Sequence, residues 1–135
     1  MRKYLLILLF LLSFPASATE DIAPEHINGA LTVNTATARL LFAKGYIFID
    51  VRKLEDFNKE HIPRAKNLAV NSENFTPENL IAIVNKDQAV IFYCNGIHCL
   101  GSSKASRKAA EWGWQKILYY REGLPMWKEA GFAVE

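Results

Sequence analysis

Two cysteines stand five residues apart in one short segment, and the chain has no others. An apolar run, residues 91–93, ends directly before Cys94, and a polar loop containing Gly96 leads on to Cys99 and a helical pattern. A thiol between a buried strand and a helix N-terminus meets backbone N–H groups and the positive end of the helix dipole. Such surroundings can lower a cysteine pKa of about 8.5 by several units. The segment therefore predicts that Cys94 is a reactive thiolate.

The second cysteine, Cys99, has two interpretations. As a resolving thiol it would attack a persulfide or sulfenic acid on Cys94, release sulfide or water, and leave a disulfide. As a small side chain it would only fill a loop position. A disulfide that closes so short a loop restrains the unfolded chain little, because its entropic effect grows with loop length. The pattern therefore favours a chemical role for the pair.

The N-terminal residues have the pattern of an export signal. Arg2 and Lys3 precede the apolar run 4–12, and Ala16-Ser-Ala18 has the form of a signal-peptidase site. We therefore predict a secretory signal peptide over residues 1–18, cut after Ala18, with an uncleaved anchor as the alternative. The protein would then be periplasmic or secreted, in a compartment where disulfides persist.

Cleavage would leave 117 of the 135 residues, enough for one domain with one core. Loss of Arg2 and Lys3 would bring the formal net charge from +2 to zero, and no polybasic run would remain. This argues against nucleic acid, or a membrane after signal cleavage, as the main partner. We expect an N-terminal leader over residues 19–31, a domain over 32–135, and a monomer.

Apolar strand patterns alternate with helical patterns along the mature chain. The expected strands are residues 27–33, 46–51, 89–93 and 117–120, with an extended segment within 61–68. The expected helices are residues 37–44, 54–59, one that Thr76 caps, one that Ser102 or Ser103 caps and that runs to Trp112, and 124–130. This alternation predicts an α/β fold with a mainly parallel sheet covered on both faces. Ligands bind beyond the carboxyl ends of such strands, where Asp50 and Cys94 stand.

Three separated segments resemble the rhodanese-like domain. They are Phe48-Ile-Asp-Val-Arg52 with Phe57 and His61-Ile-Pro63, then Tyr93-Cys94 before a helix rich in Ser, Lys and Ala, then Gly123-Leu-Pro-Met-Trp-Lys-Glu-Ala-Gly-Phe-Ala-Val134. Their order and spacing agree with that family over residues 32–135. The resemblance implies a three-layer sandwich around a five-stranded, mainly parallel sheet.

The resemblance also implies sulfurtransferase chemistry. Cys94 matches the family's persulfide-forming cysteine, which takes sulfur from a small sulfur-containing anion such as thiosulfate and passes it to a thiol or cyanide. The attack follows the logic of nucleophilic catalysis, and anionic groups need preorganised N–H donors. We expect these from the backbone of the loop residues Asn95, Gly96, Ile97, His98 and Cys99.

The loop departs from the family pattern at Gly101, where a similar subgroup often has a basic residue. Lys104, Arg107 or Arg64 could supply the missing cation. Asp50 and Arg52 could contact the substrate or, as such pairs more often do, order the end of their strand.

Two further functions stay open. The Cys94/Cys99 pair could serve a periplasmic thiol–disulfide or sulfur-redox enzyme with a redox partner protein, or the domain could be a non-catalytic sulfur carrier or redox-binding module. Phosphatase or arsenate-reductase chemistry is less favoured, because the loops of such relatives generally end in an arginine, whereas this chain has Gly101. We expect no cofactor and no metal, because Cys94, His98 and Cys99 lie too close together for a usual zinc spacing.

Overall fold

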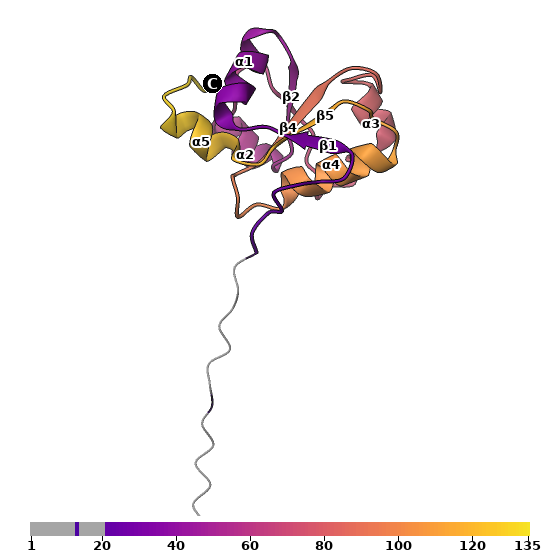
Figure 1. Cartoon of the computed structure of the whole chain (residues 1–135), viewed down its shortest axis with the longest axis horizontal. Coiled ribbons are helices and arrows are strands. Elements are labelled where there is room, and N and C mark those ends of the chain that lie inside the picture. Colours follow the sequence, from indigo (N-terminus) through magenta and orange to yellow (C-terminus); the bar gives the residue numbers. More distant parts are fainter. Residues whose placement is uncertain (1–12, 14–20) are drawn as a thin grey trace, which may run out of the picture.

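Five parallel strands form one sheet at the centre of the domain. A computed structural model of the chain describes residue 13 and residues 21–135 (Figure 1). In spatial order the strands are β1 (Ala30–Thr32), β5 (Ile117–Tyr120), β4 (Val90–Tyr93), β2 (Ile47–Asp50) and β3 (Lys66–Asn67). All four pairings between neighbouring strands are parallel. The structure therefore confirms the predicted α/β fold with a five-stranded parallel sheet.

Helices cover the sheet on both faces, as Figure 1 shows. The helices of the described residues are α1 (Thr35–Ala43), α2 (Leu54–Lys59), α3 (Pro77–Ile81), α4 (Gly101–Glu111) and α5 (Gly123–Glu129). Side chains alternate across each strand, so the two faces of the sheet build separate clusters. Leu80 of α3 and Ala105 of α4 belong to one cluster, and Ala38 of α1 and Trp127 of α5 belong to the other.

Strand β4 is buried along its whole length and ends directly before Cys94. Val90 and Phe92 pack in the α3–α4 cluster, while Ile91 and Tyr93 pack in the α1–α5 cluster. A strand buried on both faces is read from sequence as a continuous apolar run, which is how it was predicted. Its neighbour β2 brings Asp50 opposite Tyr93, so both strands end at the same edge.

Helix α4 begins differently from the prediction. Its N-cap is Leu100, which offers no side-chain hydrogen bond, whereas Ser102 and Ser103 lie buried inside its first turn. The Ser103 hydroxyl donates to the Leu100 carbonyl at 2.8 Å from within the helix, and no side chain caps the helix start. The helix begins at Gly101 because the Lys104 N–H already donates to the Leu100 carbonyl, at 3.0 Å.

The leader expected over residues 19–31 is part of the fold where the structure describes it. Ala23 and Ile27 are buried, and β1 crosses the expected boundary. The Ala23 N–H donates to the Ile97 carbonyl at 2.7 Å, and Arg121 Nε donates to the Ala23 carbonyl at 2.8 Å. The N–H and the carbonyl of Ala23 thus bind the cysteine loop and Arg121, so the described part of the expected leader packs against the domain.

The predicted signal peptide, residues 1–18, lies outside the described residues except for residue 13. Within the described part of the chain, none of the helices has the length and apolar character that crossing a membrane requires.

Removal of the segment before His26 should loosen the cysteine loop. A chain starting at His26 loses the donor to Ile97, whereas one starting at Asp21 keeps it. We expect faster amide hydrogen exchange over residues 95–99 in the shorter chain, because the loop loses a backbone hydrogen bond that restrains it. Mass spectrometry of the exchanged peptides measures this, and equal exchange in the two chains would show that the segment does not restrain the loop.

Candidate active site

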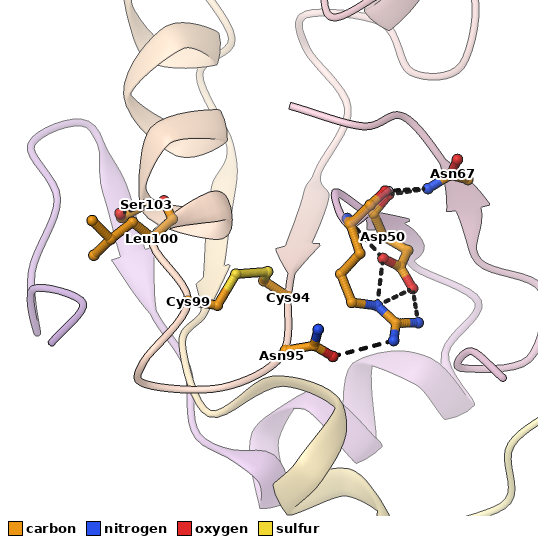
Figure 2. Close-up of a disulfide and its surroundings, with 8 residues drawn as sticks. Asp50, Asn67, Cys94, Asn95, Cys99, Leu100 and Ser103 are labelled. Carbon is orange, nitrogen blue, oxygen red and sulfur yellow. Dashed lines mark hydrogen bonds and ion pairs between the residues drawn. A yellow bond between two sulfur atoms is a disulfide. The ribbon is translucent and has the colours of Figure 1, made fainter. Parts of the chain in front are cut away.

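Cys94 stands at the carboxyl end of β4 and is bonded to Cys99 (Figure 2). The two Cα atoms are 6.2 Å apart, and Cys94 is 3% exposed. The bond lies between the strand end and the first turn of α4, so the loop 95–98 is closed on itself. Both cysteines of the chain are therefore placed together, as the resolving-thiol interpretation requires.

The loop between the cysteines is held partly by its own backbone. The Cys99 N–H donates to the Gly96 carbonyl at 3.0 Å, so this N–H is occupied and does not point at the sulfur as expected. Gly96 is buried with φ +95°, a conformation that favours glycine. Asn95, Ile97 and His98 are exposed. The loop thus presents three of its expected residues to solvent.

A buried ion pair borders the loop on the β2 side. Arg52 Nη2 lies 2.6 Å from Asp50 Oδ2, and Arg52 Nε donates to the same carboxylate at 3.0 and 3.1 Å. Asp50 is fully buried and Arg52 is 7% exposed. Burial by itself would lower the pKa of Arg52, but the hydrogen bond and charge of Asp50 outweigh it and raise that pKa. The guanidinium therefore stays charged and committed to Asp50.

The same guanidinium reaches two neighbouring segments. Arg52 Nη1 donates to Asn95 Oδ1 at 3.2 Å, and Nη2 donates to the Glu60 carbonyl at the end of α2 at 2.7 Å. Asn67 of β3 donates to the backbone carbonyls of Asp50 and Arg52 at 3.1 and 2.8 Å. These contacts support the structural interpretation of Asp50 and Arg52: the pair orders the strand end and the loop around it.

Gly123 supports the loop from the other side. A Cβ on this residue would overlap the Cys94 carbonyl oxygen and stand 2.8 Å from the Gly96 nitrogen. The backbone also has φ +64° there, and the next N–H, that of Leu124, donates to the Cys94 carbonyl at 3.0 Å. The start of α5 therefore fixes Cys94 through backbone contact. The sequence contains the glycine but does not indicate that it contacts the backbone of Cys94 and Gly96.

Gly101 stands close to the two sulfur atoms. A Cβ there would lie 3.0 Å from Cys94 Sγ, 3.4 Å from Cys99 Sγ and 3.3 Å from Val51 Cγ2. The distances to Cys94 Sγ and Val51 Cγ2 are tighter than ordinary contact, so a side chain would require these neighbours to shift by a few tenths of an ångström. Gly101, which stands where similar proteins often have a basic residue, thus has a steric role. It leaves room for the disulfide between the two cysteines.

A cavity of about 320 Å³ opens beside the disulfide. This volume is at the lower end of the roughly 300–1,000 Å³ of small-molecule sites. Its apolar wall consists of Val51, Ala69, Val70, Gly101 and the two cysteines. Its polar wall consists of Arg52, Lys53, Asp56, Asn71, Ser72 and Asn95.

Most of the polar wall was missed by the sequence analysis. Lys53 and Asp56 belong to the start of α2, and Asn71 and Ser72 belong to the connection between β3 and α3. No motif in the sequence identifies these four residues as part of a site. Lys53 alone could have been predicted, because it directly follows the Asp50–Arg52 segment. They meet Cys94 only because β2 and β3 end at the same edge as β4.

The three cations expected to replace the one missing at Gly101 lie elsewhere. The Arg64 guanidinium stacks over the Phe42 ring at 4.2 Å and donates to the Phe42 carbonyl at 2.9 Å. Lys104 and Arg107 are exposed on α4, and none of the three lines the cavity. Among the described residues, no group of three or more His, Cys, Asp or Glu side chains is arranged to hold a metal ion.

This parallel sheet, with a disulfide-bonded cysteine directly after its central strand, defines an α/β domain with a candidate site at the carboxyl end of that strand. Residues 33–130 match the sequence profile of the rhodanese-like domain. The chain therefore belongs to the rhodanese-like domain family.

Three relatives illustrate the similarity. The BH2092 protein of Bacillus halodurans is 30% identical, with 77% of this chain and 75% of that chain covered and a TM-score of 0.66. The rhodanese-like domain of the Anabaena protein Alr3790 is 20% identical, with 77% of each chain covered and a TM-score of 0.63, and supports the fold. The mitochondrial protein HIGH ARSENIC CONTENT 1 of Arabidopsis thaliana is 25% identical over 126 residues, which cover 84% of this chain and 71% of that protein.

Replacement of Asp50 by Asn should destabilise the protein strongly. Arg52 would remain buried without its counter-charge, and breaking one partner of a buried ion pair typically lowers the free energy of unfolding by about 3–5 kcal/mol. Urea unfolding measures the effect, and the exposed carboxylate Asp21→Asn provides the control. An Asp50→Asn protein as stable as the control would mean that the pair does not brace the site.

The Gly123→Ala variant should lose more stability than Gly131→Ala. Both glycines have positive φ, for which a Cβ typically costs about 1–2 kcal/mol. At Gly131 nothing lies within 4 Å of the added Cβ, whereas at Gly123 it overlaps the Cys94 backbone. The difference between the two unfolding free energies isolates the contact with the loop. Equal losses would contradict the role of Gly123 as its support.

Proposed function

We propose that the protein is an exported sulfurtransferase that carries sulfane sulfur as a persulfide on Cys94. The observation that supports this most is the position of Cys94, at the end of β4, on the wall of a cavity and beside the first turn of α4. Membership of the rhodanese-like domain family, which often carries sulfur transfer, agrees with it. Export is proposed from the signal pattern of residues 1–18 alone.

The reaction begins from the dithiol. A thiol reductant must first deliver two electrons to the Cys94–Cys99 bond and leave both cysteines as thiols. The Cys94 thiolate then attacks the outer sulfur of a thiosulfate-like donor, the sulfur–sulfur bond of the donor breaks, and sulfite leaves with the bonding electrons. In the second half, an acceptor thiolate or cyanide attacks the outer sulfur of the persulfide, and Cys94 departs as the thiolate.

The helix dipole favours a thiolate at this position. Helix α4 has eleven residues and begins at Gly101, where an added Cβ would lie 3.0 Å from Cys94 Sγ, so the sulfur is near the positive end of the helix. A negative charge at a helix N-terminus is stabilised, and this lowers the pKa of a cysteine there. Arg52 contributes less to anion binding, because Asp50 already neutralises it.

A redox function is the second candidate, and the disulfide itself favours it. If Cys99 attacks the inner sulfur of a Cys94 persulfide, the outer sulfur leaves as hydrosulfide and the Cys94–Cys99 bond forms. The protein would then reduce sulfane sulfur to sulfide, and a thiol reductant or redox partner protein would restore the dithiol. Gly101 accommodates the product of this step without a clash.

Mass spectrometry of the reduced protein after thiosulfate treatment tests the proposal. We expect a mass increase of one sulfur atom on Cys94, release of sulfite, and transfer of the sulfur to added cyanide or thiol. Cys94→Ser should abolish all three. Absence of both persulfide and transfer in reduced, folded protein would contradict the sulfurtransferase proposal.

The Cys99→Ser variant separates the two candidates. For a sulfurtransferase, this variant should keep transfer to cyanide and hold its persulfide longer, because the resolving thiol is gone. For the redox function, it should lose hydrosulfide release. A persulfide that forms on Cys94 but passes to no small acceptor would instead indicate a sulfur carrier without turnover.

A further inference from the structure

The charged side chains around the cavity are of both signs. Three charged side chains line it: Arg52, Lys53 and Asp56. Arg52 is paired with Asp50, which leaves Lys53 and Asp56 as the two charges available to a ligand. They carry opposite signs, so together they suit a ligand that has one charge of each sign.

Lys53 and Asp56 stand one helical turn apart at the start of α2. The Asp56 N–H donates to the Lys53 carbonyl at 3.1 Å, and residues spaced in this way lie on one side of a helix. Asp56 is half-buried and close enough to Arg52 for its charge to help raise the pKa of that residue. Both charges therefore belong to the rim of the site.

The partners that the two side chains have now are weak. Lys53 Nζ lies 3.6 Å from Glu55, with both side chains exposed, and Asp56 lies 3.9 Å from the exposed Lys59. Exposed ion pairs of this kind contribute little free energy. A ligand with an ammonium and a carboxylate can therefore exchange for them without a large penalty.

Apolar residues complete the lining of the cavity beside the two cysteines. They are Val51, Ala69 and Val70, and Gly101 adds no side chain. A ligand that matches the cysteines, the apolar residues and the two opposite charges has three parts. It has a sulfur at one end, a short hydrocarbon stem, and an ammonium and a carboxylate together at the other end. An amino-acid thiol has this arrangement.

We infer that the acceptor in the proposed sulfur transfer is an amino-acid thiol of the cysteine type, whose carboxylate is bound by Lys53 and whose ammonium is bound by Asp56. The inference rests on the proposed function. In the step concerned, the acceptor thiol gives its proton to solvent, its sulfur bonds to the outer sulfur of the Cys94 persulfide, and the bond from that sulfur to Cys94 Sγ breaks. The products are the acceptor persulfide and the Cys94 thiolate, with no net oxidation or reduction.

A matched series of four thiols tests the inference: L-cysteine, N-acetylcysteine, cysteine methyl ester and N-acetylcysteine methyl ester. They share one stem and differ in whether the ammonium, the carboxylate or both are blocked. Rate constants for removal of sulfur from preformed persulfide are compared per thiolate. We expect the rate constant to fall about three- to fivefold, relative to that of L-cysteine, for each charge that is blocked. This size suits partly exposed ion pairs.

Variants assign each charge to its residue. Lys53→Gln should slow only the thiols that have a free carboxylate, and Asp56→Asn only those that have a free ammonium. Lys116→Gln and Glu111→Gln change the net charge equally at exposed positions that do not line the cavity, and they should leave the series unchanged. Equal rates for all four thiols with the wild-type protein would overturn the inference, as would an identical response of the two rim variants.

A failure of the proposed function can be told apart from a failure of this inference. If mass spectrometry finds no persulfide on Cys94, sulfur transfer is wrong, but the same thiols still open the Cys94–Cys99 disulfide by direct exchange. A preference for L-cysteine in that reaction, lost in Lys53→Gln and Asp56→Asn, supports the assignment of the cavity. Equal rates of opening by all four thiols overturn it.

Discussion

The buried ion pair between Asp50 and Arg52 is the interaction on which the surroundings of Cys94 depend. One guanidinium joins the end of β2 to the end of α2 and to Asn95 of the cysteine loop, while Asn67 ties the same backbone to β3. A buried pair contributes little net stability compared with an apolar packing, but it allows few alternative arrangements once formed. Its main effect here is to hold the ends of β2 and α2 against the cysteine loop, which lies far from both in the sequence.

Close backbone contact completes the site where side chains do not. Gly123 lies against the Cys94 carbonyl, and Gly101 lies against both sulfur atoms, so the loop is enclosed by main chain on two sides. This arrangement explains why the position expected to carry a cation carries none. A Cβ at Gly101 would crowd Cys94 Sγ, and the chain places its second thiol, Cys99, close by instead. In the sulfur transfer that we propose, anion binding would come from the helix dipole and from Lys53.

The N-terminal segment links the architecture to the chemistry. The Ala23 N–H donates to the Ile97 carbonyl of the loop. Arg121, directly after β5, donates to the Ala23 carbonyl. The cysteine loop is therefore anchored at two places: at the end of β4, and at Ala23 through the Ile97 carbonyl. Such anchoring suits the resolving thiol that the second candidate function requires, because it would restrain Cys99 near Cys94 after reduction.

The sequence by itself determined the parallel α/β fold, the central buried strand, the edge that Asp50 and Cys94 share, and the family. These follow from local patterns: continuous apolar runs, helix caps and three motifs in order. Only the tertiary structure decided what surrounds the thiol. In the structure, Cys99 is bonded to Cys94, and α4 begins at Gly101. The described part of the expected leader is packed against the domain. The cavity is lined by Lys53 and Asp56, not by Arg64 and Lys104. The physical reason is that such contacts depend on the distance between strand ends in space, which the spacing of residues along the chain does not encode.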